Sequence, residues 1–107
     1  MRAYDSLRRR GEFARVTRRG KRSAGPHLTC FVAEGRRRTR VGITVAASIG
    51  GAVVRNRLRR RIKAILDRYP LSAPPWRDIV FIARPGAGEL RFPELVAEVA
   101  RVFGAAP

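Results

Sequence analysis

Three segments of the chain place apolar residues at the three- and four-residue spacing of an amphipathic helix. The first covers residues 11–19, where Phe13 and Val16 share one side. The second covers residues 52–68, and the third starts near Pro93, because proline is favoured in the first turn of a helix. The apolar side of the third helix carries Leu95, Val96, Val99, Val102 and Phe103.

Strands are predicted between these helices. Residues 27–34 are rich in β-favouring side chains, and residues 40–46 alternate between apolar and other positions. Residues 79–83 form a continuous apolar run, which is typical of a strand covered on both faces. A further short strand near residues 21–24 also fits the pattern. We expect the arginine-rich run at residues 35–39 to form a hairpin loop.

The predicted order is α-β-β-α-β-α, which indicates one α+β domain over residues 1–107, with helices packed on a small sheet. The strand, helix and strand between residues 40 and 83 predict a parallel pair joined by the second helix. The usual rule makes such a crossover right-handed. We expect residues 1–10 to form a flexible basic N-terminus and residues 104–107 to form a tail.

Positive charge is concentrated in the first two-thirds of the chain. The formal net charge of the 107 residues is +16. Residues 1–68 contain 20 Lys and Arg against 4 Asp and Glu, whereas residues 69–107 contain 4 of each kind. Such a concentration of positive charge is the electrostatic signature of a nucleic-acid-binding domain.

Other features of the sequence indicate the compartment. The single Cys30 excludes an internal disulfide and fits the reducing environment of the cytoplasm. The sequence has no apolar stretch of about 18 residues, and no apolar run follows the basic residues 8–10 as it would in a secretory signal. We therefore expect a cytoplasmic protein that has no membrane partner.

The second helix combines an apolar side with dense positive charge. At about 100° per residue, an arc about 120° wide holds Val54, Leu58, Ile62, Ile65 and Leu66. The remaining surface holds Asn56, Arg57, Arg59, Arg60, Arg61 and Lys63. Arg55 lies at about 100°, at the edge of the arc, so it is either a further cationic contact or a core-edge residue, and capping of local backbone groups is the alternative for Asn56. No acidic residue accompanies them before Asp67, so the like charges call for an anionic partner such as a phosphate backbone. Gly50 and Gly51 precede the helix, whose free backbone N–H groups also favour phosphate. The alternative is an ordinary solvated charged face.

The residues give no indication of a catalytic set. The carboxylates are scattered, and neither a nucleophile–histidine pair nor a metal-ligand spacing is visible. Phe13 and Phe31 are candidates for stacking on single-stranded nucleotides, which contributes about 1–3 kcal/mol per base where it occurs. Packing in the core is the alternative for both rings, and the sequence does not decide between the two roles.

The run Gly50-Gly51-Ala52-Val53-Val54-Arg55-Asn56-Arg57-Leu58-Arg59-Arg60 resembles the motif G-N-A-V-x-R-N-R-x-K-R of the protein subunit of bacterial ribonuclease P. Matching residues lie on both sides of it, at Glu12-Phe13, at Arg40 to Val45 and at Asp78 to Pro85. The resemblance covers roughly residues 7–103. The chain departs from the family pattern at Ala47 and Ser48, which replace two lysines, at Gly51, which replaces an asparagine, and at Thr17, which replaces an aromatic residue.

This resemblance implies a function and corrects one expectation about the fold. It implies a subunit that binds the catalytic RNA of the ribonucleoprotein and assists removal of the 5′ leader from precursor tRNA. The RNA would carry out hydrolysis with Mg²⁺ that the RNA and the substrate hold, not the protein. The family fold has a left-handed crossover. Its leader cleft, between the first helix and the sheet, matches positions Phe13, Arg15, Phe31 and Thr44.

Other kinds of protein also fit some of these features. A structural ribosomal or double-stranded RNA-binding protein with no role in cleavage is the main alternative. A DNA-binding regulator is disfavoured because strands, not a second helix, flank the basic helix, so we expect no DNA partner. A helix on a membrane surface is disfavoured because the apolar side is needed for the core and has no aromatic anchors.

Overall fold

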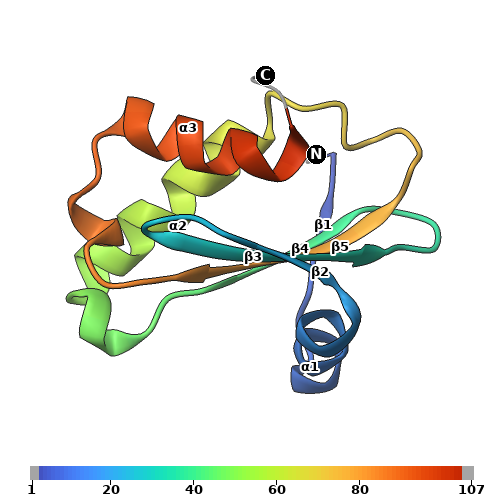
Figure 1. Cartoon of the computed structure of the whole chain (residues 1–107), viewed down its shortest axis with the longest axis horizontal. Coiled ribbons are helices and arrows are strands. Elements are labelled where there is room, and N and C mark those ends of the chain that lie inside the picture. The colour runs from blue at the N-terminus through green and yellow to red at the C-terminus, as the bar shows by residue number, and fades with distance from the viewer. Residues whose placement is uncertain (1–2, 105–107) are drawn as a thin grey trace.

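The computed structural model describes residues 3–104 of the chain (Figure 1). Within these residues the helices are α1 (Arg10–Arg19), α2 (Ala52–Leu66) and α3 (Phe92–Phe103). The strands are β1 (Asp5–Ser6), β2 (Lys21–Ala24), β3 (Leu28–Glu34), β4 (Arg40–Thr44) and β5 (Arg77–Ala83). Short 3-10 turns precede α2 and α3, at η1 (Ala47–Ile49) and η2 (Ala87–Glu89). The predicted helices and strands are all present, including the short strand near residues 21–24.

The sheet has the strand order β1-β4-β5-β3-β2. β4 and β5 are parallel, as predicted, whereas β3 is antiparallel to both β5 and β2. The prediction of a hairpin at residues 35–39 is wrong, because β5 lies between β3 and β4. β5 is the most apolar strand and is almost entirely buried, so it takes the central position, where both faces of the sheet are covered.

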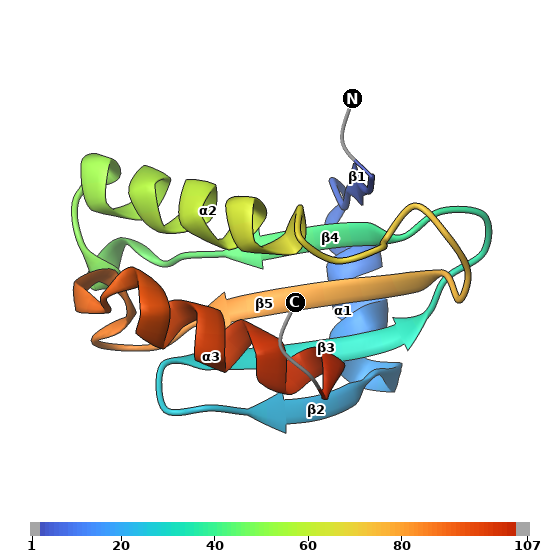
Figure 2. The same cartoon turned by 90° about the horizontal axis from the view of Figure 1, so that it is seen from above.

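The helices divide between the two faces of the sheet. α2 and α3 lie side by side on one face, and α1 lies on the other (Figure 1). When the sheet is viewed with α2 in front and the strands pointing upwards, β5 lies to the left of β4 (Figure 2). The β4-α2-β5 crossover is therefore left-handed, as the family resemblance implies and contrary to the usual rule.

Each helix layer encloses its own apolar cluster. Beneath α2 and α3, the fully buried side chains include Ile62, Ile65, Leu66, Phe81, Leu95 and Val99. Beneath α1, Val16 and Val80 are fully buried, and Phe13 and Phe31 pack against them with part of each ring exposed. The apolar spacing of all three helices therefore identified the side that each one buries.

The N-terminal segment is more ordered than its sequence indicates. Tyr4 and Leu7 are each only 5% exposed, and β1 pairs in parallel with β4 at the edge of the sheet. The Asp5 and Leu7 amides donate to the carbonyls of Thr39 and Val41 at 2.9 and 3.0 Å. The expectation of a flexible N-terminus is thus wrong for residues 4–7, where two apolar anchors precede the basic run. Residues 1–2 and 105–107 of the predicted termini lie outside the described residues.

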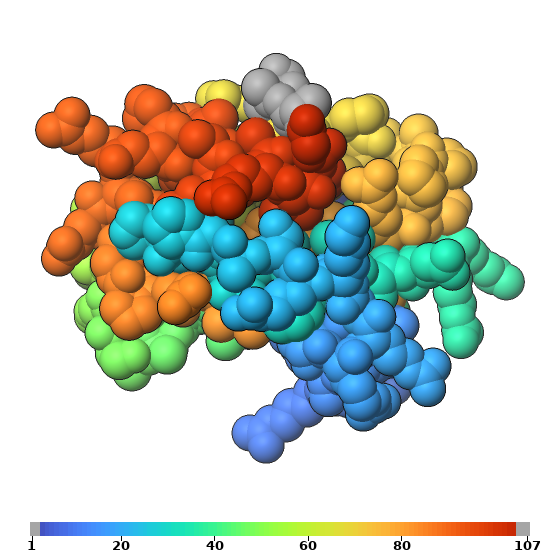
Figure 3. Space-filling view, in the orientation of Figure 1, coloured from blue at the N-terminus to red at the C-terminus, as the bar shows by residue number. Residues whose placement is uncertain are grey.

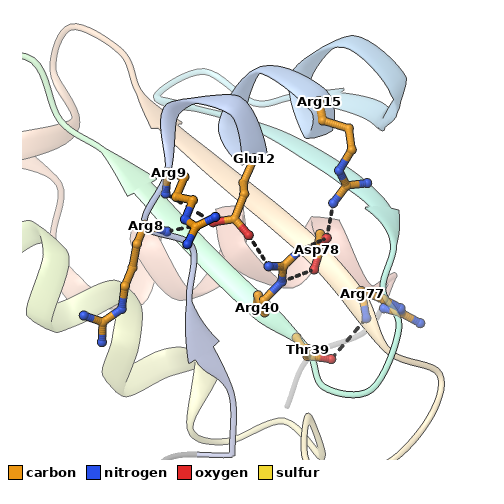
Figure 4. Close-up of polar contacts among 8 residues, drawn as sticks. All are labelled: Arg8, Arg9, Glu12, Arg15, Thr39, Arg40, Arg77 and Asp78. Atoms are coloured by element: carbon orange, nitrogen blue, oxygen red, sulfur yellow. Dashed lines mark hydrogen bonds and ion pairs between the residues drawn. The ribbon is translucent and has the colours of Figure 1, made fainter.

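A network of charged side chains fastens α1 to the sheet (Figure 4). Asp78 on β5 is 2% exposed and accepts two hydrogen bonds from Arg40 on β4, at 3.0 Å from Nε and 2.8 Å from Nη2. Arg15 of α1 also binds Asp78, and Glu12 of α1 binds Arg40. The network gives the buried carboxylate charged donors from two elements, which is what a buried charge requires.

Glu12 makes the stability of the fold depend on pH. Its carboxylate accepts the backbone N–H of Arg9 at 3.2 Å and of Arg8 at 3.4 Å. The Arg9 amide, with smaller contributions from the Arg8 amide and the Arg40 charge, holds the pKa of Glu12 below its ordinary value of 4.5, although partial burial acts the other way. A carboxyl group whose pKa is lower in the folded state stabilises the fold above its unfolded pKa.

We therefore expect the free energy of unfolding to fall as the pH drops below about 4.5, through the lower pKa of folded Glu12. Urea unfolding measured between about pH 6 and pH 3 checks this. The Glu12→Gln variant should be less stable than the wild type near neutral pH and should show a shallower loss in acid. Parallel pH profiles for the two proteins would show that Glu12 makes no such contribution.

Candidate nucleic-acid interface

The apolar side of α2 packs on the sheet, and its basic side faces outward. Leu58, Ile62, Ile65 and Leu66 are buried, as predicted. Asn56, Arg57 and Arg60 are exposed, whereas Arg55, Arg59, Arg61 and Lys63 are partly buried. Val53, 76% exposed, lies on the outward side among the charged residues. The predicted division of the helix into an apolar side and a cationic side is confirmed.

The N-terminus of α2 leaves backbone donors free. Gly51 is the N-cap residue, and no side chain caps the first turn, which also contains no acidic residue. A Cβ on Gly51 would meet nothing within 4 Å, whereas a Cβ on Gly50 would lie 2.9 Å from Val54 Cγ1. Gly50 therefore allows the chain to approach the helix closely, and Gly51 leaves the free N–H groups accessible to an anion.

One open groove runs along the outward side of α2. It has a volume of about 400 Å³ and is lined by Val53, Asn56, Arg59, Arg60 and Lys63. Arg59 donates a long hydrogen bond of 3.4 Å to Asn56 Oδ1, which orients the arginine along the helix. The groove therefore presents cations and an amide above an exposed methyl surface, and this arrangement suits a sugar–phosphate backbone.

Arg61 lies apart from the rest of the predicted site. Its guanidinium donates to the carbonyl oxygen of Leu90 at 3.3 Å, in the segment that leads into α3. This contact joins α2 to the segment before α3 and occupies part of the donor capacity of Arg61. The helical wheel gave the signal for this role, because Arg61 falls about 20° outside the apolar arc.

One residue of the predicted leader cleft, Phe13, lines a small depression together with side chains of α2. This depression of about 170 Å³ brings Phe13 of α1 together with Arg59 and Lys63 of α2. Its floor includes Gly42 and Leu7, and a Cβ on Gly42 would come within 2.5 Å of the Phe13 ring. Sequence reasoning missed the contribution of the β1 segment, because a strand of two residues leaves no periodicity to detect.

The other predicted cleft residues share the α1 face of the sheet but do not converge. Phe31 is half-buried beneath α1, whereas Thr44 is exposed at the end of β4. In the register of the sheet, Thr44 pairs with Ile82, two residues along β5 from the partner of Phe31. Arg15 binds Asp78 instead of facing outward freely. Arg15 therefore helps to hold α1 on the sheet, and the rings of Phe13 and Phe31 are each partly exposed.

The carboxylate of Glu98 is occupied by contacts within the protein. Glu98 of α3 accepts the backbone N–H groups of His27 and Leu28 at 2.9 and 3.0 Å, and its other oxygen lies 2.8 Å from His27 Nδ1. Among the residues that the structure describes, no three His, Cys, Asp or Glu side chains gather where they could share a metal ion. Within the same residues, none of the helices has the length and apolar character needed to cross a membrane.

Cys30 is buried in the core, and its burial raises the pKa of the thiol to about 12. Because the thiolate is the reactive form, we expect the folded protein to resist a thiol-specific disulfide reagent near pH 8. One thiol per chain should react once the protein is unfolded in guanidinium chloride. Rapid labelling of the folded protein would contradict the burial of this residue.

Together these features define a small basic α+β domain in which an exposed cationic helix, α2, connects β4 to β5 in a left-handed crossover. The family model described as Ribonuclease P matches residues 1–106 of the chain. The ribonuclease P protein component of Roseiflexus castenholzii is 47% identical over 105 residues, which cover 95% of this chain and 84% of that protein. The corresponding protein of Acidothermus cellulolyticus is 39% identical over 101 residues, which cover 92% and 84%. The chain therefore belongs to the ribonuclease P protein family, as its basic-helix motif predicted.

Solved structures agree with this assignment. The RNase P protein from Thermotoga maritima has a TM-score of 0.78 and 26% identity, with 92% of this chain and 94% of that chain covered. The RNase P protein of Staphylococcus aureus has a TM-score of 0.82 with 21% identity, which supports the fold. The predicted fold class is confirmed by these neighbours.

Proposed function

We propose that this chain is the protein subunit of a ribonuclease P ribonucleoprotein and assists removal of the 5′ leader from precursor tRNA in the cytoplasm. It binds the catalytic RNA through the outward side of α2, and it holds the leader on the face of the sheet that α1 partly covers. The RNA carries out the hydrolysis of the phosphodiester bond, and the RNA and the substrate hold the Mg²⁺ ions that the reaction uses.

The single observation that supports this proposal most strongly is the exposed cationic side of α2, at Arg57 and Arg60. Arg57 and Arg60 are exposed, no acidic residue precedes Asp67 on the helix, and the apolar side is already buried. Like charges spaced three or four residues apart destabilise a helix slightly. A phosphate backbone supplies negative charge to these arginines, whose side chains can bind it in a bidentate manner.

The contribution of the protein is electrostatic and positional. Two RNAs that approach each other repel through their phosphates, and fixed cations between them lower this repulsion. The small depression that joins Phe13 with Arg59 and Lys63 offers an apolar floor and a cationic rim to a single-stranded nucleotide. The chain would therefore tighten substrate binding and lower the Mg²⁺ concentration that cleavage requires.

Reconstitution tests this function. The host's catalytic RNA should cleave the 5′ leader of a precursor tRNA at low Mg²⁺ concentration much faster with the chain than without it. Equal rates with and without the chain would overturn the proposal. Binding to ribosomal RNA without any stimulation of cleavage would instead favour a structural RNA-binding protein.

A further inference from the structure

A groove of about 550 Å³ is lined by the C-terminal end of α3, by β2 and β3, and by the segment before β5. Its apolar lining side chains are each partly exposed: Val32, Trp76, Val102 and Phe103. Val32, Val102 and Phe103 pack on the core cluster beneath α2 and α3. The groove therefore lies on the opposite face of the sheet from α1 and from the cleft proposed for the leader.

The groove borders a free edge of the sheet. β2 is the last strand on its side, and among the described residues it pairs with β3 alone. Figure 2 shows β2 at the outer edge, and in Figure 3 the light-blue surface of β2 lies uncovered below the red end of α3. Lys21 pairs with Val32, which packs on the core beneath α3, so the Lys21 side chain lies on the groove side of β2. An exposed strand edge is a template for an added strand.

The rim of the groove is cationic. Lys21, Arg22 and Arg101 are exposed, and within the part of the chain that the structure describes they have no ion-pair partner. Glu34 is the one carboxylate among the described residues that line the groove. An occupant of the groove should therefore carry negative charge.

Two features favour a polypeptide over RNA as the occupant. A strand edge presents N–H donors and C=O acceptors, and a polypeptide backbone matches both, whereas phosphate groups supply acceptors only and would repel the edge carbonyls. The Phe103 ring also has partners within the protein already. It stacks on Tyr69 with ring centroids 4.1 Å apart, and the Arg77 guanidinium carbon lies 6.0 Å from its centroid.

A second copy of this chain does not fit the edge. Each copy has a formal net charge of +16, and pairing of two β2 strands would bring the cations of both edges together. Cations on an edge strand prevent pairing between identical chains. The same cations attract an acidic strand, so the edge selects against self-association and for a partner of opposite charge.

We propose that the outer edge of β2 and the adjoining groove form a docking site for an acidic, extended segment of a partner protein. The segment adds to the sheet beside β2 as a further strand, and its apolar side chains enter the groove against Val32, Trp76 and Val102. Its carboxylates pair with Lys21 and Arg101 at the rim. The inference does not depend on the proposed function, because it uses no residue of α2 or of the cleft beneath α1.

Two synthetic peptides test the site on the full-length protein. In the acidic probe, glutamate alternates with valine and phenylalanine, and in the basic probe lysine replaces every glutamate. Trp76 is the only tryptophan of the chain, so its fluorescence reports directly from the groove. We expect the acidic probe to change this fluorescence saturably, to slow amide hydrogen exchange in residues 21–24, and to bind at least about tenfold more tightly than the basic probe.

Matched variants separate the groove from the overall charge of the protein. Lys21→Glu/Arg101→Glu reverses two exposed cations at the rim, and Arg57→Glu/Arg60→Glu makes the same change of charge on α2, which lies away from β2 (Figure 2). The rim variant should bind the acidic probe about tenfold more weakly than the wild type and the basic probe more tightly. The α2 variant should bind both probes nearly as the wild type does. Urea unfolding confirms that both variants are folded.

Several outcomes would overturn the docking site. One is an unchanged Trp76 fluorescence with the acidic probe, and another is a lack of protection in residues 21–24. Equal losses of affinity in the two variants would show that net charge, not the groove, attracts the probe. A single-stranded RNA oligonucleotide that displaces the acidic probe from the wild-type protein and fails to do so from the α2 variant's rim-substituted counterpart would assign the groove to RNA instead.

Discussion

Replacement of Arg55, Arg57 and Arg59 by glutamine should weaken binding to the catalytic RNA by roughly 100-fold and raise the Mg²⁺ concentration needed for half-maximal cleavage. Three charge-assisted contacts that each contribute about 1 kcal/mol amount to about 3 kcal/mol, and each 1.4 kcal/mol is a factor of ten in affinity. When fixed cations are lost, dissolved Mg²⁺ has to screen the phosphates in their place. A titration of the cleavage rate against Mg²⁺ measures the change.

The triple variant should remain folded. Glutamine is a good helix former, and none of the three replaced side chains is among the buried residues of α2, which are Leu58, Ile62, Ile65 and Leu66. Removal of like charges four residues apart slightly favours the helix.

A control with Lys21, Arg22 and Arg101 replaced by glutamine removes the same charge from another surface. If this control shifts the Mg²⁺ requirement as far as the α2 variant does, net charge and not the α2 surface is responsible.

The Asp78→Asn substitution should cost about 2–4 kcal/mol of stability, a large part of the 5–15 kcal/mol that holds a typical small domain folded. Asp78 is 2% exposed and receives donors from both Arg15 and Arg40. An asparagine turns an N–H group toward at least one of these guanidinium groups, so donor faces donor. Because both arginines are about one-third exposed and can be rehydrated in part, the cost stays below that of a fully buried charge.

The matched control for Asp78 is Asp5→Asn, which breaks an ion pair with Arg38 of 3.0 Å on the surface. The Asp5 side chain is 55% exposed, so this change should cost less than about 1 kcal/mol. Urea unfolding at neutral pH measures both variants under the same conditions. Equal losses of stability would show that the network beneath α1 is no stronger than a surface ion pair.

The sequence was sufficient to predict those elements that the spacing of neighbouring residues identifies. The apolar arc of α2 predicted which side is buried because helical spacing fixes which residues share a face. The continuous apolar run of β5 predicted a strand covered on both faces, and the structure places it at the centre of the sheet.

Features that depend on distant parts of the chain could not be predicted in this way. The hairpin between β3 and β4 was a reasonable expectation from chain order, but the insertion of β5 depends on a strand more than 30 residues later. The role of Arg15 depends on Asp78, which is 63 positions away. The left-handed crossover followed only from the family resemblance, since the general rule predicts the opposite hand.

In the candidate site, too, the features with a local signal could be predicted from the sequence, and those that depend on distant residues could not. The outward position of Asn56, Arg57 and Arg60 follows from the helical wheel, and the structure confirms it. The depression between Phe13 and Lys63 could not be foreseen, because it requires α1, β1 and α2 to meet at one edge of the sheet. Whether these residues contact RNA stays a prediction that rests on their exposure, their charge and their grouping.

The most direct test of the central claim is the affinity of the wild-type chain for the host's catalytic RNA as a function of salt concentration. If the outward side of α2 binds phosphates, the logarithm of the association constant should fall steeply and linearly with the logarithm of the salt concentration. The slope should become shallower by about 2 to 3 when Arg55, Arg57 and Arg59 are replaced by glutamine. An affinity that barely responds to salt, or a slope that the triple substitution leaves unchanged, would contradict the account.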